Sequence, residues 1–473
     1  MSSVHSVCDS AVARCATGQT AAKHPNLILT ATILASSLAF VDGSVVNVAL
    51  SAIAQNFKAD SGSLQWIINA YLLPLSALLL LGGAAGDHFG RRRLLLVGTA
   101  TFAAASLACS LAPTLATLQA SRLLQGVGAA LLMPNSLAIL GQTFAGESKG
   151  RVIGIWAATG AAMGAIGPVL GGWLIDLGSW RAIFLLNLPL AVGAIALAWV
   201  FVPSDRIEDR QPLDALGAVL ATVALGALTW GLTVGSGAQG WTVSAVSATG
   251  VAVCLMLAFL KLESARANRA MMPLSLFASR SFVGLTLFTL LLYGSLGELF
   301  VLVPYFLIRA AGYSATAAGA ALIPLPLILT VSSPFAGALG SRIGARIPLT
   351  IGPLVVAVGF LLALRIGADA NYWTSVLPMI VVIGVGMSGA VAPLTTAVLT
   401  SVDSRHTGSA SGLNSAVARS GGLVATALLG TVLGAAGAHL VSAFHTAMVL
   451  GAAASCAASL SACALLGSQI SRR

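Results

Sequence analysis

The chain alternates long apolar runs with short polar segments. A helix that crosses a membrane needs about 20 apolar residues, and the apolar runs reach that length repeatedly. We predict fourteen spanning helices, at residues 27–50, 63–85, 94–112, 115–142, 152–175, 182–202, 214–235, 241–260, 282–308, 315–338, 347–367, 374–400, 409–435 and 440–466. The predicted fold class is therefore an all-α integral membrane protein.

The composition agrees with this pattern. Hydrophobic residues make up 57% of the chain and charged residues 8%, whereas a soluble globular protein carries roughly 25% charged residues. The net charge of +10 comes from basic residues scattered among the loops. This scatter is typical of membrane orientation rather than of a nucleic-acid surface, so we expect no nucleic-acid partner.

The basic residues also predict the orientation, because cytoplasmic loops retain Lys and Arg. With both termini in the cytoplasm, most of the 24 Lys and Arg residues fall on the cytoplasmic side. The loops predicted outside keep only Lys58, Arg181, Arg309 and Arg365. We expect a multi-pass protein of the inner (plasma) membrane.

The chain repeats itself internally. The segment Gly337 to Arg346 aligns without a gap on Gly83 to Arg92, with Ser341 in place of Asp87. The offset exceeds the length of six helices by about the length of two more, and such duplications are typical of secondary transporters. We predict a cytoplasmic tail at 1–26, a six-helix half at 27–203, an inserted two-helix linker at 204–273, a second six-helix half at 274–466 and a tail at 467–473.

Motifs along the chain resemble the major facilitator superfamily, specifically its fourteen-span drug/proton antiporter branch. The turn after the second span, GGAAGDHFGRRR from Gly82, is similar to the family's loop signature. Four further motifs and the start of the sixth span follow the same order: DGSVVNVAL from Asp42, WxxxxY from Trp66, RLLQGVGAA from Arg122, GAAMGAIGPVLGG from Gly160 and WRAIFLLNLP from Trp180. The resemblance implies a major facilitator fold of two six-helix halves plus two inserted helices.

The resemblance also implies a function, which is proton-coupled export of small lipophilic compounds such as drugs or antibiotics. The expected partners are a small-molecule substrate, protons and the lipid bilayer, and we expect a monomer. Two alternatives stay open: an exporter restricted to one endogenous metabolite, and a membrane sensor without flux. The chain contains no phosphate-binding loop and no cluster of His, Cys and acidic residues with metal-ligand spacing, so we expect no enzyme, cofactor or metal.

Asp42 and Arg122 are the predicted proton-coupling pair. Asp42 falls in the middle of the first span, where an ionised carboxylate is costly and usually lines a pathway. Burial disfavours its charged form, whereas a nearby guanidinium favours it. Arg122 stays charged in essentially any protein environment, and Gln125 is a secondary candidate beside it. A structural hydrogen bond for Asp42 and a carbonyl-bound Arg122 are the alternatives.

Glu298, in the ninth span, is the second intramembrane acid. The repeat offset places it symmetrically to Asp42 across a central cavity, where it would neutralise a cationic substrate or bind a second proton. The alternative is a structural pair with Arg419. The resemblance implies further substrate contacts at Asn47, Trp66, Asn69 and Tyr71, although Asn69 stands where some exporters of dications carry an acid.

Two groups of residues are predicted to control gating. In the turn after the second span, Asp87, Gly90, Arg91 and Arg92 would form a cytoplasmic latch, with the carboxylate at a helix N-terminus; a solvated loop is the alternative. In the fifth span, small residues let helices approach closely and proline loosens the backbone. Static packing is the alternative there, and the residues are Gly164, Gly167, Pro168, Gly171 and Gly172.

Overall fold

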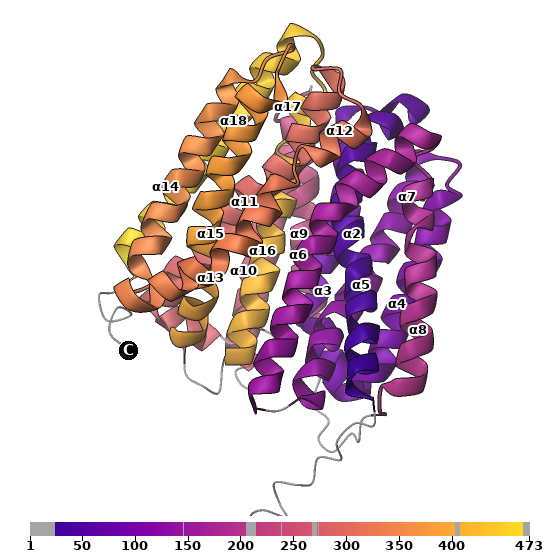
Figure 1. Ribbon diagram of the computed structural model, residues 1–473, viewed down its shortest axis with the longest axis vertical. Coiled ribbons are helices and arrows are strands. Elements are labelled where there is room, and N and C mark those ends of the chain that lie inside the picture. Colours follow the sequence, from indigo (N-terminus) through magenta and orange to yellow (C-terminus); the bar gives the residue numbers. More distant parts are fainter. Residues whose placement is uncertain are drawn as a thin grey trace, which may run out of the picture.

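A computed structural model describes residues 24–144, 146–204, 214–237, 239–266, 272, 274–402 and 407–466. These residues form helices joined by short turns, with no strand among them. Figure 1 shows the long helices standing side by side as one bundle. The predicted all-α membrane fold is confirmed.

The helices fall into three consecutive groups. The first group is α2 (Pro25–Phe57), α3 (Ser61–Phe89), α4 (Arg91–Ser110), α5 (Leu115–Thr143), α6 (Gly146–Leu177), α7 (Ala182–Leu185) and α8 (Asn187–Phe201). The middle pair is α9 (Ala215–Ser236) and α10 (Val243–Arg266). The last group is α11 (Arg280–Arg309), α12 (Ala315–Ala320), α13 (Pro324–Ile343), α14 (Arg346–Leu362), α15 (Leu377–Thr400), α16 (Thr407–Ala427), α17 (Gly430–Leu433) and α18 (Ala438–Leu465).

The first and last groups of helices pack in the same way. In the first group, α2 lies against α6 and α8, and α4 lies against α5. In the last group, α11 lies against α16 and α18, and α14 lies against α15. The two groups stand beside one another in the bundle, one in indigo and purple and the other in orange and yellow (Figure 1).

The repeated turn adopts one conformation in both groups. Gly90 joins α3 to α4 with φ 97°, and Gly344 follows α13 with φ 85°. Both values lie in the region that favours glycine because a Cβ would be strained there. Just after each turn an arginine donates to a backbone carbonyl of the last long helix of its own group: Arg92 to Trp199 O, and Arg346 to Cys463 O.

Proline breaks two of the predicted spans. The span predicted at 315–338 divides into α12 and α13, because Pro324 has no N–H to donate to the carbonyl of Ala320. The span predicted at 182–202 divides into α7 and α8, where Pro189 cannot donate to Leu185. Both helix pairs still continue in the same direction across the bundle (Figure 1).

One helix differs from the other spans in its composition. Thirteen of the helices in the described ranges are long and apolar enough to cross a membrane. The prediction at 409–435 corresponds to α16 and α17, which are not among the thirteen. Because α16 packs between α3 and α11 inside the bundle, it does not need the uniformly apolar surface of a lipid-facing helix.

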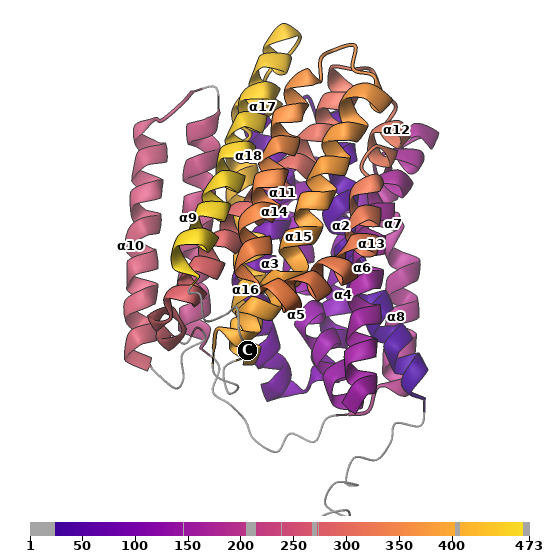
Figure 2. The same cartoon turned by 60° about the vertical axis from the view of Figure 1, so that its left-hand side comes forward.

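The middle pair lies on the flank of the bundle. α9 packs against α3, α16 and α17, and α10 packs mainly against α9. Figure 2 shows α10 as the outermost helix on this side. The tails predicted at 1–26 and 467–473 lie outside the described residues except for residues 24–26, as do parts of the linkers that flank this pair.

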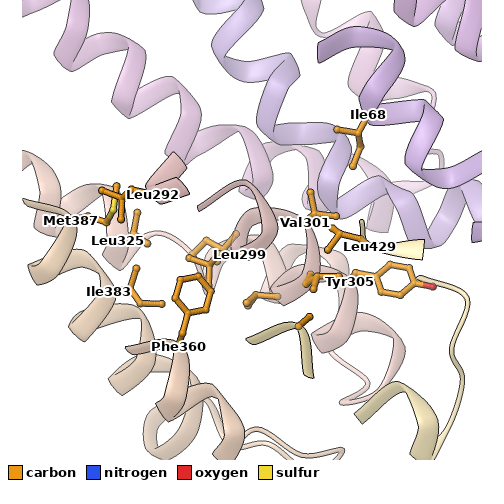
Figure 3. Packing of buried hydrophobic residues seen from close by; sticks show 14 of the residues in the cluster. Ile68, Leu292, Leu299, Val301, Tyr305, Leu325, Phe360, Ile383, Met387 and Leu429 are labelled. Atoms are coloured by element: carbon orange, nitrogen blue, oxygen red, sulfur yellow. The ribbon is translucent and has the colours of Figure 1, made fainter. Parts of the chain in front are cut away.

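A buried apolar cluster joins the first and last groups of helices. It includes Ile68 of α3 with Leu299 and Val301 of α11, and it extends to Phe360 of α14 and Ile383 of α15 (Figure 3). Burial against neighbouring helices, rather than exclusion from water alone, stabilises such a core in a membrane.

Hydrogen bonds between α6 and α12 connect the first and last helix groups at the end of the bundle opposite Gly90. The carboxylate of Asp176 accepts hydrogen bonds from the backbone N–H groups of Ala315 (3.2 Å) and Thr316 (2.9 Å), and from the Thr316 hydroxyl (2.5 Å). We call this the Asp176 end and the opposite one the Gly90 end.

Candidate functional site

The structure pairs the two residues predicted for proton coupling. Asp42 on α2 and Arg122 on α5 form an ion pair through Asp42 Oδ2 and Arg122 Nη1. The two side chains are 0% and 1% exposed. Such a pair is isolated from solvent, and removal of either partner would leave an uncompensated buried charge.

Neighbouring amides complete the coordination of this pair. Gln125 accepts from Arg122 Nη1 at 2.9 Å and donates to Asp42 Oδ1 at 3.1 Å. Arg122 Nε also donates to the carbonyl of Ile67 at 3.1 Å. Gln125 thus bridges the two charges, which gives this secondary candidate a direct structural place.

Three further members of the cluster escaped the sequence analysis. Asn187 Nδ2 donates to Asp42 Oδ1 (3.2 Å) and to the Ser106 hydroxyl (3.0 Å), and Gln125 Nε2 also donates to that hydroxyl (2.7 Å). The Cys109 thiol donates to Gln125 Oε1 at 3.3 Å. Ser106 and Cys109 lie in an apolar run without a distinguishing signal, whereas Asn187 was visible as an amide within the sixth-span motif.

Tyr71 belongs to the same cluster. Its ring lies under the Arg122 guanidinium, 4.5 Å from the ring centroid, and its hydroxyl donates to the carbonyl of Ala39. The side chain is 1% exposed. In this conformation Tyr71 therefore supports Arg122, and its role as a substrate contact stays a prediction.

The other predicted contacts of the first two spans differ in their surroundings. Asn47 and Asn69 are buried, and Trp66 is half-buried. Neither polar atom of the Asn69 side chain has a hydrogen-bond partner among the described residues. A buried amide without hydrogen-bond partners is energetically costly. The Asn69 side chain can therefore accept hydrogen bonds from, and donate them to, a ligand or a water molecule.

Glu298 does not share a cavity with Asp42. It lines a cavity of about 460 Å³ whose described residues come from α11, from α16, α17 and the turn between them, and from α18. Its neighbour on α18 is Gly451, where an added Cβ would lie 3.2 Å from Glu298 Oε2. The prediction that the two acids face each other across one cavity is wrong, because Glu298 points toward α18 within its own group.

The alternative pairing of Glu298 with Arg419 is also wrong. Glu298 Oε1 has no hydrogen-bond partner in the described part of the chain, and Arg419 Nη2 donates to Met133 Sδ on α5 at 3.2 Å. Arg419 lines a separate cavity of about 370 Å³ between α11, α15 and α16. The two charges therefore occupy different sites.

The predicted latch residues lie at the Gly90 end. Arg91 donates to Asp87 Oδ1 from Nε (2.9 Å) and Nη2 (2.7 Å), and Arg91 Nη1 donates to Ala138 O on α5. Asp87 lies in the last turn of α3 rather than at a helix N-terminus. That expectation is corrected: Arg91, in the first turn of α4, supplies the stabilising charge instead of helix N–H groups.

The small residues of α6 face two partners. An added Cβ at Gly167 would overlap the Ser44 hydroxyl of α2, and one at Gly171 would overlap the Val45 side chain of the same helix. An added Cβ at Gly172 would overlap the carbonyl oxygen of Ala315 on α12, whereas one at Gly164 would have no neighbour within 4 Å. Pro168 lies within the same helix, and its carbonyl would overlap a Cβ added at Gly319 of α12.

Comparison with known proteins identifies the family. The model of the Major Facilitator Superfamily matches residues 32–426. The chain belongs to this superfamily. The resemblance to its drug-efflux branch is confirmed by the relatives of this major facilitator.

Several curated relatives are resistance or export proteins. The "Multidrug resistance protein Stp" of Mycobacterium tuberculosis is 33% identical over 86% of this chain and 76% of its own length. The "Tetracenomycin C resistance and export protein" of Streptomyces glaucescens is 33% identical over 83% and 73%. The "Methylenomycin A resistance protein" of Bacillus subtilis is 31% identical over 89% and 91%.

Solved structures agree on the fold. A POT family transporter in complex with a thioalcohol-conjugated peptide superposes with a TM-score of 0.69 at 14% identity, over 93% of this chain and 95% of the other. A bacterial homolog of the human lysosomal transporter Spinster, inward-facing and unoccupied, gives a TM-score of 0.64 at 17% identity, over 93% and 98%. The family match and the export relatives, rather than these structures, make this major facilitator a multi-pass membrane transporter with small-molecule substrates.

Proposed function

We propose that this major facilitator is a proton-coupled antiporter that exports small lipophilic compounds, among them antibiotics, by alternating access as a monomer. The names of its relatives support drug or antibiotic efflux. The observation that carries proton coupling is the buried pair of Asp42 and Arg122 with its amide neighbours.

The chemistry of the pair supports a protonation switch. Ionised Asp42 neutralises Arg122 and accepts hydrogen bonds from Gln125 and Asn187. A proton on Asp42 would remove this neutralisation, and a buried arginine without a partner is unfavourable. Protonation would therefore loosen the contact of α2 with α5, and favour another arrangement of the helices.

Antiport requires that proton and substrate prefer different arrangements. A ligand shifts a conformational equilibrium only by its differential affinity for the two states. Asp42 is sealed from solvent in this conformation, so proton exchange belongs to a state in which the bundle has opened. Asn47, Trp66 and Asn69 are the proposed substrate contacts of α2 and α3, and the orphaned amide of Asn69 supports this assignment.

The orientation and the domain plan are part of the same proposal. The Gly90 end faces the cytoplasm together with both termini, as the distribution of Lys and Arg indicates. The flanking pair α9 and α10 is an insertion between two six-helix halves, which its position outside the bundle supports (Figure 2).

The test compares Asp42→Asn with Glu298→Gln, which makes the same chemical change in the other acid-containing site. In an efflux-deficient host challenged with tetracenomycin C and methylenomycin A, the wild type should restore growth and Asp42→Asn should not. In proteoliposomes, Asp42→Asn should keep exchange of substrate across the membrane but lose its dependence on the proton gradient. Glu298→Gln should keep that dependence. Gradient-driven export by Asp42→Asn would refute the role of Asp42.

A further inference from the structure

Arg419 is a partly buried cation of the bundle that has no acidic partner among the described residues. It lies on α16, which packs between α3 and α11, and its one hydrogen bond within the described residues runs to Met133 Sδ. A thioether is only a weak acceptor, whereas a guanidinium carries five N–H donors. The ion pairs of the described residues do not include Arg419.

The Arg419 guanidinium, which lies within a spanning helix, requires a group that neutralises or solvates its charge. Charged side chains inside membrane spans are costly and face a cavity, a partner or a transport pathway. Arg122 shows how this chain satisfies such a charge, with a carboxylate, an amide and a carbonyl. Arg419 has none of these, so its counterpart is not supplied by the described part of the protein.

The cavity beside Arg419 is polar, and none of its described lining residues is an acid. Its volume is about 370 Å³, and among the described residues its polar lining consists of Tyr293, Thr395, Ser411, Asn414, Ser415 and Arg419. Asn414 Oδ1 accepts from the Thr289 hydroxyl at 2.7 Å, which leaves the amide hydrogens of Asn414 for another partner. Ser411 and Ser415 are exposed although they lie on an internal helix. The lining thus offers donors and one positive charge.

We infer that this cavity binds an anionic oxygen group, such as a carboxylate, of the exported compound. The planar guanidinium matches a carboxylate with two parallel hydrogen bonds, and the bound anion neutralises the partly buried charge. The inference rests on the proposed function as an exporter and adds the charge class of its substrate. Because Arg419 also contacts Met133 of the other helix group, the anion competes with a contact between the two groups.

The test uses three probes that share one ring system and differ in charge: 2-naphthoate, 2-naphthamide and 2-naphthylmethylammonium. Equilibrium dialysis with the full-length protein in detergent measures binding without any flux. A hydrogen-bonded charge contributes roughly 1.5–3 kcal/mol, so we expect 2-naphthoate to bind roughly 10- to 100-fold tighter than the amide. Arg419→Gln should lose this preference, and Arg419→Lys should keep part of it.

Asn414→Asp is the second variant, since it leaves Arg419 in place and neutralises it from within the cavity. It should also lose the preference for 2-naphthoate. Arg309→Gln, a change of the same type at the end of α11, should keep it. Asp42→Asn should keep it too, so that failure of proton coupling and failure of anion binding are distinguishable.

Three results would overturn the inference. The first is a preference for 2-naphthoate that survives in Arg419→Gln. The second is a preference for the ammonium probe that Glu298→Gln abolishes, because the charged group of the ligand would then lie in the Glu298 cavity. The third is the absence of binding by all three probes.

Discussion

A single buried carboxylate explains the arrangement of the residues around it. Asp42 is 0% exposed, and an ionised group there is tolerated only with a charged partner and further hydrogen bonds. Arg122 and Gln125 of α5 and Asn187 of α8 provide these. Glu298 has no such partners in the described residues, so the two acids have different chemistry despite their similar places in the repeat.

Also at the residue scale, the charge of Asp87 contributes little to the stability of the folded protein. Its carboxylate is 49% exposed and pairs with Arg91 four residues on, and pairs at such positions contribute about 1 kcal/mol or less. We propose that Asp87 stabilises one access state at the Gly90 end.

Asp87→Asn should therefore leave abundance and thermal stability near the wild type and lower the rate of transport several-fold. Uptake into inverted vesicles measures that rate, and fluorescence-detected size exclusion measures the abundance. Asp60→Asn is the matched control, because Asp60 is an exposed acid at the opposite end that caps α3. Unchanged transport by Asp87→Asn would mean that the turn serves only the orientation.

At the scale of the elements, glycines decide which helices approach most closely. Gly172 of α6 and Gly319 of α12 each lie against the backbone of the other helix. The same region holds the hydrogen bonds of Asp176 to the first turn of α12. Small residues and a carboxylate thus join the two helix groups at one place.

Gly172→Ala should separate these helices, whereas Gly164→Ala on the same helix should not, because Gly164 has open space around it. Overpacking costs typically 1–3 kcal/mol, so we expect roughly a tenfold or larger loss of the closed arrangement at the Asp176 end. Maleimide labelling of Ala315→Cys, which is 7% exposed, reports this loss directly. Equal labelling in the two alanine variants would show that Gly172 does not control the contact.

At the scale of the whole molecule, the number of helices that cross the membrane determines on which side of the membrane each loop lies. α9 has 22 residues, or about 33 Å of helix, which matches a hydrocarbon core of about 30 Å. We therefore expect the pair of α9 and α10 to cross twice and to return the chain to its starting side. The helices before and after the pair keep the same orientation.

Cysteine labelling tests this topology in a background without native cysteines. Gln239→Cys, between α9 and α10, should react with a membrane-impermeant maleimide in intact cells. Ser264→Cys, at the other end of α10, should react only after permeabilisation. Both positions are exposed, so accessibility to the reagent is not limited by the protein. Labelling of both from one side would contradict the fourteen-helix arrangement.

The sequence by itself determined the class, the spans, the repeated turn and the identity of the charged residues inside the membrane. These features are local, since hydropathy and glycine or proline positions depend on short stretches of chain. The breaks at Pro189 and Pro324 follow from the same local chemistry.

Only the tertiary structure decided which side chains meet. A helix inside a membrane bundle is apolar on most of its faces, so its sequence gives little indication of its rotation about its own axis. The contact of Asn187 with Asp42, and those of Ser106 with Asn187 and Gln125, therefore formed without a sequence signal for them. For the same reason Glu298 and Arg419 looked like partners and lie in separate cavities: their sequence positions fixed their depth in the membrane, and helix packing fixed their direction.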